Sequence, residues 1–239
     1  NAAVAGATFQ IRYLGGTSGT GGTVIGTYQT SANGSFTVTG LDAGTYIVEE
    51  IASDADHVVD TSPQTVVLTG KNQYVVTLRF SNSPLGSLLI KKVCSLNSAK
   101  VLSGAEFKVT YADGTLIGND NGSYTTDENG SILIEGLEPG KSVVVTETKA
   151  PDGFILDTTP QTAVIKAGKT VSLTFTNAPK GQLIIEKRDS VTNALLSGAE
   201  FTVTTAAGCE VGSNGNIGCG GSGTISSDST FTTGADGKI

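Results

Sequence analysis

Lys92 is placed by the sequence where a lysine side chain is not usually tolerated. In the stretch GSLLIKK (86–92), a strand of period two puts Lys92 on the same face as Leu88 and Ile90. A lysine that continues an apolar face points into the core, where burial disfavours the ammonium form. The side chain should therefore be either neutral or paired, and a neutral amine is a nucleophile.

A matching electrophile and an acid stand near strand ends of the same repeat. The segment TFTN ends in Asn177, whose side chain is an amide, and VVVTETKAP carries Glu147. A carboxylic acid kept protonated by burial can polarise an amide and shuttle protons. If the three groups are held in contact, Lys92 and Asn177 can form an isopeptide bond with loss of ammonia, once and without turnover.

The alternation of residues alone leaves other interpretations open. Lys92 could extend its amine to the sheet edge, or a bulge could turn Lys91 inward instead. Asn177 could cap a turn, and Glu147 could be solvated.

Internal repeats organise the chain. FSNSPLGSLLIKK (80–92) matches FTNAPKGQLIIEK (175–187), at a separation of 175 − 80 = 95 residues. VDTSPQTVVLTG (59–70) likewise matches LDTTPQTAVIKAG (156–168), and GATF or GAEF opens a strand in each copy. The expected domains are three repeats. Residues 1–85 are a repeat lacking its first strand, residues 86–180 are a complete repeat, and residues 181–239 are the N-terminal part of a third.

The segments between turn signals read as short strands. ATFQIRY, FTVTGL, TYIVEE, TVVLTG and YVVTLRF all alternate apolar and polar residues, and no stretch has a capped helical period. Asn33-Gly34 and Asn129-Gly130 predict hairpin turns in which both residues have positive φ. The predicted fold is all-β, with tandem immunoglobulin-like β-sandwiches of about seven strands each. The short proline-containing links 83–85 and 178–180 favour a rod.

Composition excludes several functional classes. The 239 residues carry a net charge of −7, so the Lys/Arg surplus that nucleic-acid binding requires is missing. The sequence contains no run of about 18 apolar residues, so no segment of it is predicted to insert into a membrane. The acidic turns lack EF-hand spacing, and the single histidine, His57, has no nucleophile motif beside it. We expect neither a metal, nor a cofactor, nor enzymatic activity.

Three cysteines are present. Cys209 and Cys219 flank the Gly/Asn-rich loop CEVGSNGNIGC, which could close as a disulfide or carry two unpaired thiols. Zinc binding is less favoured, because no second Cys/His pair accompanies them. Cys94 is left over.

The strand lysine, the segment ETKAPDGF (147–154) and the terminal FTN (175–177) together resemble the Cna protein B-type repeats of Gram-positive surface adhesins and pilins. These repeats are also described as SpaA-like, prealbumin-like domains, and the resemblance covers essentially the whole chain. It implies a prealbumin-like β-sandwich with an intramolecular isopeptide bond. Carried over to this sequence, the bond joins Lys92 to Asn177 and Glu147 assists it.

The outer repeats carry incomplete sets of these residues. The first keeps Glu50 and Asn82, although EIASDADHVVD replaces ETKAPDGFILD there, and the third keeps Lys187. Their missing partners would lie beyond the two ends of this sequence. A bond in trans, from Lys187 of one molecule to Asn82 of the next, is conceivable.

The resemblance implies a structural role. The expected function is a stalk segment of a cell-surface adhesin or pilus-like fibre, located outside the cell at its surface or wall, with neighbouring repeats as partners. The alternative is a binding module that recognises a host matrix protein or a glycan. The long insertion 206–228 would then supply the binding loop.

Overall fold

The structure is a computed structural model that describes residues 2–15, 22–70, 75–118, 120–204, 210–211, 217–218 and 230–239. Every regular element in these ranges is a β-strand, which confirms the predicted all-β class. Within them, no helix is long and apolar enough to cross a membrane. The chain divides into two compact units, 1–180 and 181–239, and each is described separately.

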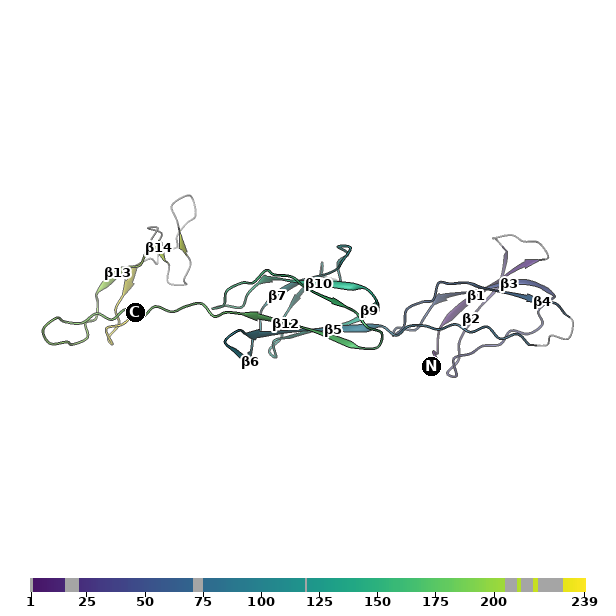
Figure 1. Ribbon diagram of the computed structural model, residues 1–239, viewed down its shortest axis with the longest axis horizontal. Coiled ribbons are helices and arrows are strands. Elements are labelled where there is room, and N and C mark those ends of the chain that lie inside the picture. The colour runs from purple at the N-terminus through teal and green to yellow at the C-terminus, as the bar shows by residue number, and fades with distance from the viewer. Residues whose placement is uncertain are drawn as a thin grey trace. The chain divides into compact units, whose positions relative to one another are not determined.

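The described residues of the first repeat form one antiparallel sheet with the strand order β2-β1-β3-β4 (Figure 1). The inward positions of its central strands alternate as predicted, with Phe9 and Ile11 on one strand and Tyr46 and Val48 on the other. These residues form the centre of the first hydrophobic core. The strands are β1 (Thr8–Gly15), β2 (Thr23–Gln29), β3 (Gly44–Ala52) and β4 (Gln64–Leu68).

Two segments predicted as strands in this repeat form no strand within the residues that the structure describes. FTVTGL (36–41) and the described part of YVVTLRF (75–80) are not assigned to any ladder. Their counterparts in the middle repeat, β9 (Ser131–Leu137) and β12 (Thr170–Asn177), both pair with β5 (Gly86–Cys94). The described part of the first repeat has no counterpart of β5, so the alternating pattern has no backbone partner there.

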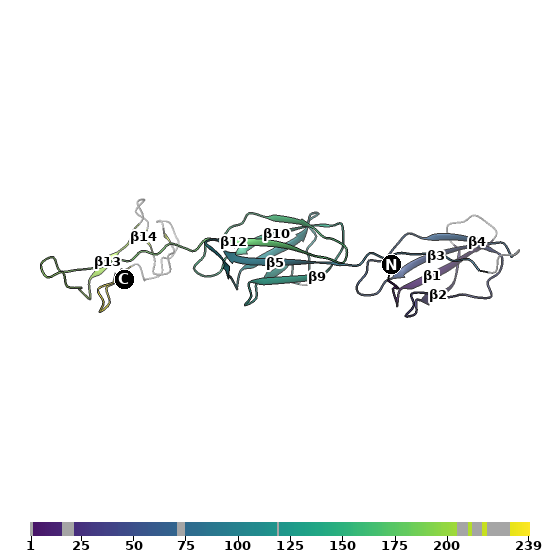
Figure 2. The same ribbon diagram turned by 60° about the horizontal axis from the view of Figure 1, so that its bottom comes forward.

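The middle repeat is a sandwich of two sheets, which lie as two layers in Figures 1 and 2. One sheet has the order β11-β10-β7-β8, and the other has the order β12-β5-β6, with β9 also paired to β5. The remaining strands are β6 (Asn97–Val101), β7 (Glu106–Tyr111), β8 (Ser123–Thr125), β10 (Ser142–Lys149) and β11 (Gln161–Val164). The predicted sandwich is confirmed, with eight strands described rather than about seven.

The two sheets of the middle repeat close over one apolar core. Phe107 and Phe175 meet at its centre, with ring centroids 4.9 Å apart. Burying side chains of this size contributes about 1.5–3 kcal/mol each. The core residues are Leu88, Ile90, Ala105, Phe107, Val109, Ile117, Ile132, Ile134, Leu137, Val143, Val145, Ile165 and Phe175.

The hairpin turns differ from the predicted type. Gly34 and Gly130 have φ values of +73° and +65°, whereas neither Asn33 nor Asn129 is among the described non-glycine residues with positive φ. The carboxylate of Asp127 explains the second turn, because it accepts the N–H groups of Asn129 at 2.9 Å and Ser131 at 2.7 Å. This bonding favours a type I turn followed by a left-handed glycine.

Residues 181–239 contain the pairs β13 (Glu200–Thr202) with β16 (Thr230–Thr232) and β14 (Glu210–Val211) with β15 (Ile217–Gly218). One pair of threonine hydrogen bonds in this unit is the same as in the other two repeats. Thr233 donates to the carbonyl of Leu196 at 2.9 Å and accepts the N–H of Ala199 at 3.0 Å. Thr126 and Thr30 make the same two bonds in the other repeats.

Candidate functional site

Lys92 lies in the core of the middle repeat, as the alternation on β5 predicted. Its side chain is 0% exposed, while Lys91 on the opposite face is exposed. Nζ lies 3.0 Å from Oε1 of Glu147, and 5.8 and 6.0 Å from the ring centroids of Phe107 and Phe175. Burial lowers the pKa of Lys92 below the ordinary lysine value, and the Glu147 carboxylate opposes only part of this shift.

Glu147 reaches the lysine from the facing sheet. It stands on β10, paired with Phe107 of β7, and its side chain is fully buried. Oε1 faces Lys92, while Oε2 accepts the Nδ2–H of Asn177 at 2.8 Å. Oε2 also accepts the backbone N–H of Asp157 at 3.3 Å. One carboxylate therefore contacts the amine and the amide together.

Asn177 is placed beside Lys92 by the parallel ladder between β12 and β5. Phe175 is the register partner of Lys92, and Asn177 follows two residues later on the same inward face, opposite Cys94. Asn177 is 1% exposed. The first and last strands of the repeat thus carry the amine and the amide side by side, and the acid comes from across the sandwich.

The polar atoms of this cluster are poorly satisfied. Lys92 and Glu147 form a close ion pair, yet neither Nζ nor Oε1 has a well-aligned hydrogen bond to the described residues, and neither does Oδ1 of Asn177. Buried polar groups are normally paired, and an unpaired one costs about 1–3 kcal/mol. Nζ of Lys92 and Oε1 of Glu147 have each other at 3.0 Å, so Oδ1 of Asn177 is the atom of this cluster left without a partner among the described residues.

The first repeat has a related pair. Glu50 is 2% exposed, and its two carboxylate oxygens accept Nδ2–H of Asn82 at 2.7 and 2.8 Å. Nδ2 of Asn82 also donates to the carbonyl of Val58 at 2.9 Å. Glu50 and Asn82 are therefore brought together as the sequence suggested, and Asn82 is only partly buried.

Lys187 of the third repeat is exposed. Its backbone nevertheless bonds as that of Lys92 does, because Lys187 N–H donates to Gly237 and its carbonyl accepts from Leu196. The equivalent partners of Lys92 are Gly130 and Leu102. A bond in trans between Lys187 and Asn82 stays a prediction.

Two contacts were missed by the sequence reasoning. The backbone N–H of Asp157 binds the buried Glu147, and that of Asp60 binds Glu50 at 2.9 Å. The signal was present in the repeated VDTSPQT and LDTTPQT segments (59–65 and 156–162), whose aspartates are these residues.

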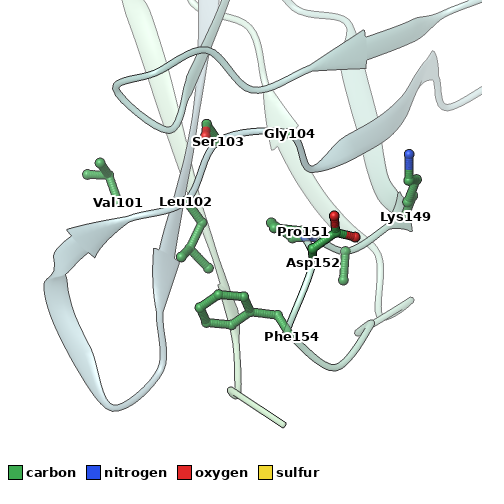
Figure 3. Close-up of a pocket in the computed structure, with 9 residues that line it drawn as sticks. Val101, Leu102, Ser103, Gly104, Lys149, Pro151, Asp152 and Phe154 are labelled. Atoms are coloured by element: carbon green, nitrogen blue, oxygen red, sulfur yellow. The ribbon is translucent and has the colours of Figure 1, made fainter. Parts of the chain in front are cut away.

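A groove opens on the middle repeat beside the site (Figure 3), between the 101–104 connection and the segment 149–154. Phe154 points across it towards Leu102, and Nζ of Lys100 lies 5.2 Å from the centroid of the Phe154 ring. The backbone N–H of Leu102 donates to the carbonyl of Lys92 at 2.9 Å. Lys92, Glu147 and Asn177 do not line the groove, so the cluster is closed to it.

The remaining predicted sites are less well defined. Cys209 and Cys219 lie outside the described residues, as does most of the insertion 206–228, whereas Cys94 is a buried free thiol. Within the described part of the chain, no three His, Cys, Asp or Glu residues are grouped to hold a metal.

Comparison with known families identifies the domain type. The model of the SpaA prealbumin-like fold domain matches residues 1–84 and, separately, residues 86–179. The chain therefore belongs to the family of SpaA prealbumin-like domains, which confirms the resemblance inferred from the lysine, ETKAPDGF and FTN. A search of curated proteins found no match.

Several solved structures are similar to the chain. The Bacillus anthracis TIE protein is 24% identical with a TM-score of 0.42, covering 99% of this chain and 40% of that one. The shaft pilin SpaA of Lactobacillus rhamnosus GG is 16% identical with a TM-score of 0.46, covering 75% and 90%. A streptococcal ancillary pilin is 25% identical with a TM-score of 0.42, covering 75% and 59%. The chain thus spans less than half of the first of these proteins.

Proposed function

We propose that this chain is a load-bearing stalk segment of a bacterial cell-surface adhesin or pilus-like fibre, with neighbouring repeats or subunits as its partners. In this proposal the middle repeat is stapled by an isopeptide bond between Lys92 and Asn177. The supporting observation is the buried cluster in which Nζ of Lys92 and Nδ2 of Asn177 both contact the Glu147 carboxylate. Membership of the SpaA prealbumin-like family supports a location at the cell surface.

The chemistry needs only these three side chains. The Lys92 ammonium gives a proton to Glu147, which leaves a neutral amine and a neutral carboxylic acid, as burial favours. Nζ then attacks Cγ of Asn177 and forms the new C–N bond. The bond from Cγ to Nδ2 breaks, and Nδ2 leaves as ammonia.

Glu147 is placed to move the protons in this reaction. One oxygen faces the attacking amine and the other faces the leaving nitrogen, at 3.0 and 2.8 Å. The carboxyl group can therefore accept a proton from Nζ and supply one to Nδ2. Because the chain consumes its own side chains, the reaction happens once, and the chain is not an enzyme.

The position of the bond suits a stalk under tension. β5 and β12 are adjacent and parallel, and they are the first and last strands of the repeat. A pull on the two ends of the repeat would pass along β5 to Lys92, through the bond, and out beyond Asn177. The enclosed span of 177 − 92 = 85 residues would carry no load.

Single-molecule pulling on the whole chain tests this role. In the wild-type chain, we expect the residues between Lys92 and Asn177 to add no contour length when the chain is pulled. Lys92→Ala should add an unfolding event with roughly 280–310 Å of extra contour length, from about 3.3–3.6 Å per residue. Lys91→Ala, an exposed neighbour on the same strand, is the matched control and should behave as wild type. Equal contour lengths for wild type and Lys92→Ala would rule out the load-bearing bond.

A further inference from the structure

The residues that follow the buried acid make the same contact in two repeats. Ten positions after Glu147, the backbone N–H of Asp157 donates to Oε2 of that carboxylate at 3.3 Å. Ten positions after Glu50, the N–H of Asp60 donates to Oε2 of Glu50 at 2.9 Å. The intervening sequences differ, TKAPDGFIL in one and IASDADHVV in the other, so the shared contact does not follow from a shared loop sequence.

In both repeats the aspartate side chain closes a local turn. Oδ1 of Asp157 accepts the N–H of Thr159 at 3.0 Å, and Oδ1 of Asp60 accepts the N–H of Ser62 at 3.0 Å. A side chain that bonds the backbone two residues ahead in this way fixes the local backbone. The fixed backbone directs the aspartate's own N–H at the buried acid.

The direction of this N–H affects the orientation of the Glu147 carboxyl group relative to Lys92. Oε2 of Glu147 is held from two sides, by Asp157 N–H and by Asn177 Nδ2. These two bonds favour the orientation of the carboxyl group in which Oε1 is directed at Nζ of Lys92, 3.0 Å away. Such orientation matters because a small misplacement of a reacting group can cost a large factor in rate.

The charge of Asp157 does not explain its presence. Its side chain is exposed, and its negative charge favours the ammonium form of Lys92, which is the unreactive one. Asparagine closes the same kind of turn without that charge. The position therefore needs the turn rather than the carboxylate.

We propose that Asp157 is a positioning residue for the Lys92–Asn177 bond, acting through the turn that aims its backbone N–H at Glu147. This inference rests on the proposed function of the site. It assigns Asp157 no direct contact with the reacting atoms.

The test follows bond formation during synthesis of the whole 239-residue chain. The chain is made in a cell-free translation, quenched in acid at timed intervals, and analysed by intact mass for loss of ammonia. We expect Asp157→Ala to form the bond about tenfold more slowly, as the loss of one orienting hydrogen bond implies. Asp157→Asn should remain within about twofold of wild type, because it keeps the turn.

A second variant separates positioning from general stability. Asp113 accepts the N–H of Thr115 at 2.9 Å in an exposed turn, whereas the hydrogen bonds and ion pair of Glu147 within the described residues are with Lys92, Asn177 and Asp157. Asp113→Ala is therefore the matched control and should leave the rate unchanged. Thermal unfolding of Asp157→Ala in a Lys92→Ala background, where no bond can form, should show a shift no larger than that caused by Asp113→Ala.

Each outcome has a distinct meaning. A wild-type rate for Asp157→Ala would overturn this inference and leave the proposed bond intact. Equal slowing by Asp157→Ala and Asp157→Asn, or equal slowing by Asp113→Ala, would also overturn it. A wild-type chain that never loses ammonia would overturn the proposed function itself, and the positioning role with it.

Discussion

Lys92→Ala is expected to lower the unfolding temperature of the middle repeat by more than about 15 °C. The variant cannot form the bond, so the unfolded chain regains the freedom of an 85-residue span. By analogy with a disulfide, closing a span of that length is worth about 4–5 kcal/mol. For a domain of this size, each kcal/mol corresponds to about 4–8 °C. Differential scanning calorimetry of the whole chain measures the shift.

The matched control is again Lys91→Ala, since Lys91 is exposed on the same strand. This control should melt within a few degrees of wild type, because surface substitutions usually change stability by less than about 0.5 kcal/mol. If both alanine variants melted at the wild-type temperature, the middle repeat would contain no stabilising cross-link through Lys92.

Glu147→Gln is expected to slow bond formation by about 10²-fold or more. The amide keeps the shape of the side chain but cannot accept the amine proton and pass one to the leaving nitrogen, and general acid–base catalysis contributes about 10²–10⁴-fold. Unreacted chains should also be less stable, because Lys92 would be left buried without its carboxylate, and breaking a buried ion pair costs about 3–5 kcal/mol. Intact mass and thermal unfolding report the two effects.

Glu138→Gln serves as the control for this substitution. Glu138 forms an exposed pair with Lys141, at 3.7 Å, and exposed pairs of this kind contribute about 0–1 kcal/mol. The Glu138→Gln variant should form the Lys92–Asn177 bond at the wild-type rate. Normal bond formation in Glu147→Gln would show that the acid takes no part in the chemistry.

Part of the site was predictable from the sequence. Period two on GSLLIKK (86–92) predicted that Lys92 continues the apolar face of its strand, and the structure buries it there rather than at the sheet edge. The strand-end positions of Glu147 and Asn177 suggested them as partners of Lys92, and the family resemblance then pointed to the same two residues. Neither could show that the carboxylate crosses between the two sheets to contact both nitrogens, since that depends on the packing of β10 against β5 and β12.

Other features depended on partners that local patterns do not reveal. The segments 36–41 and 75–80 alternate as strands should, yet a strand forms only where another strand can pair with it. The turn at Asn129-Gly130 depended on the Asp127 side chain two residues earlier. Asp157 was overlooked because it acts through its backbone N–H, a group that every non-proline residue possesses.

Intact-mass spectrometry of the reduced chain, followed by peptide mapping, tests the proposed bond most directly. We expect a mass one ammonia below the value calculated from the sequence, and a branched peptide that joins Lys92 to Asn177. Covalent multimers, or a second missing ammonia, would instead indicate bonding in trans through Lys187 and Asn82. An unshifted mass with Lys92 and Asn177 in separate linear peptides would contradict the isopeptide bond and leave an ordinary β-sandwich repeat.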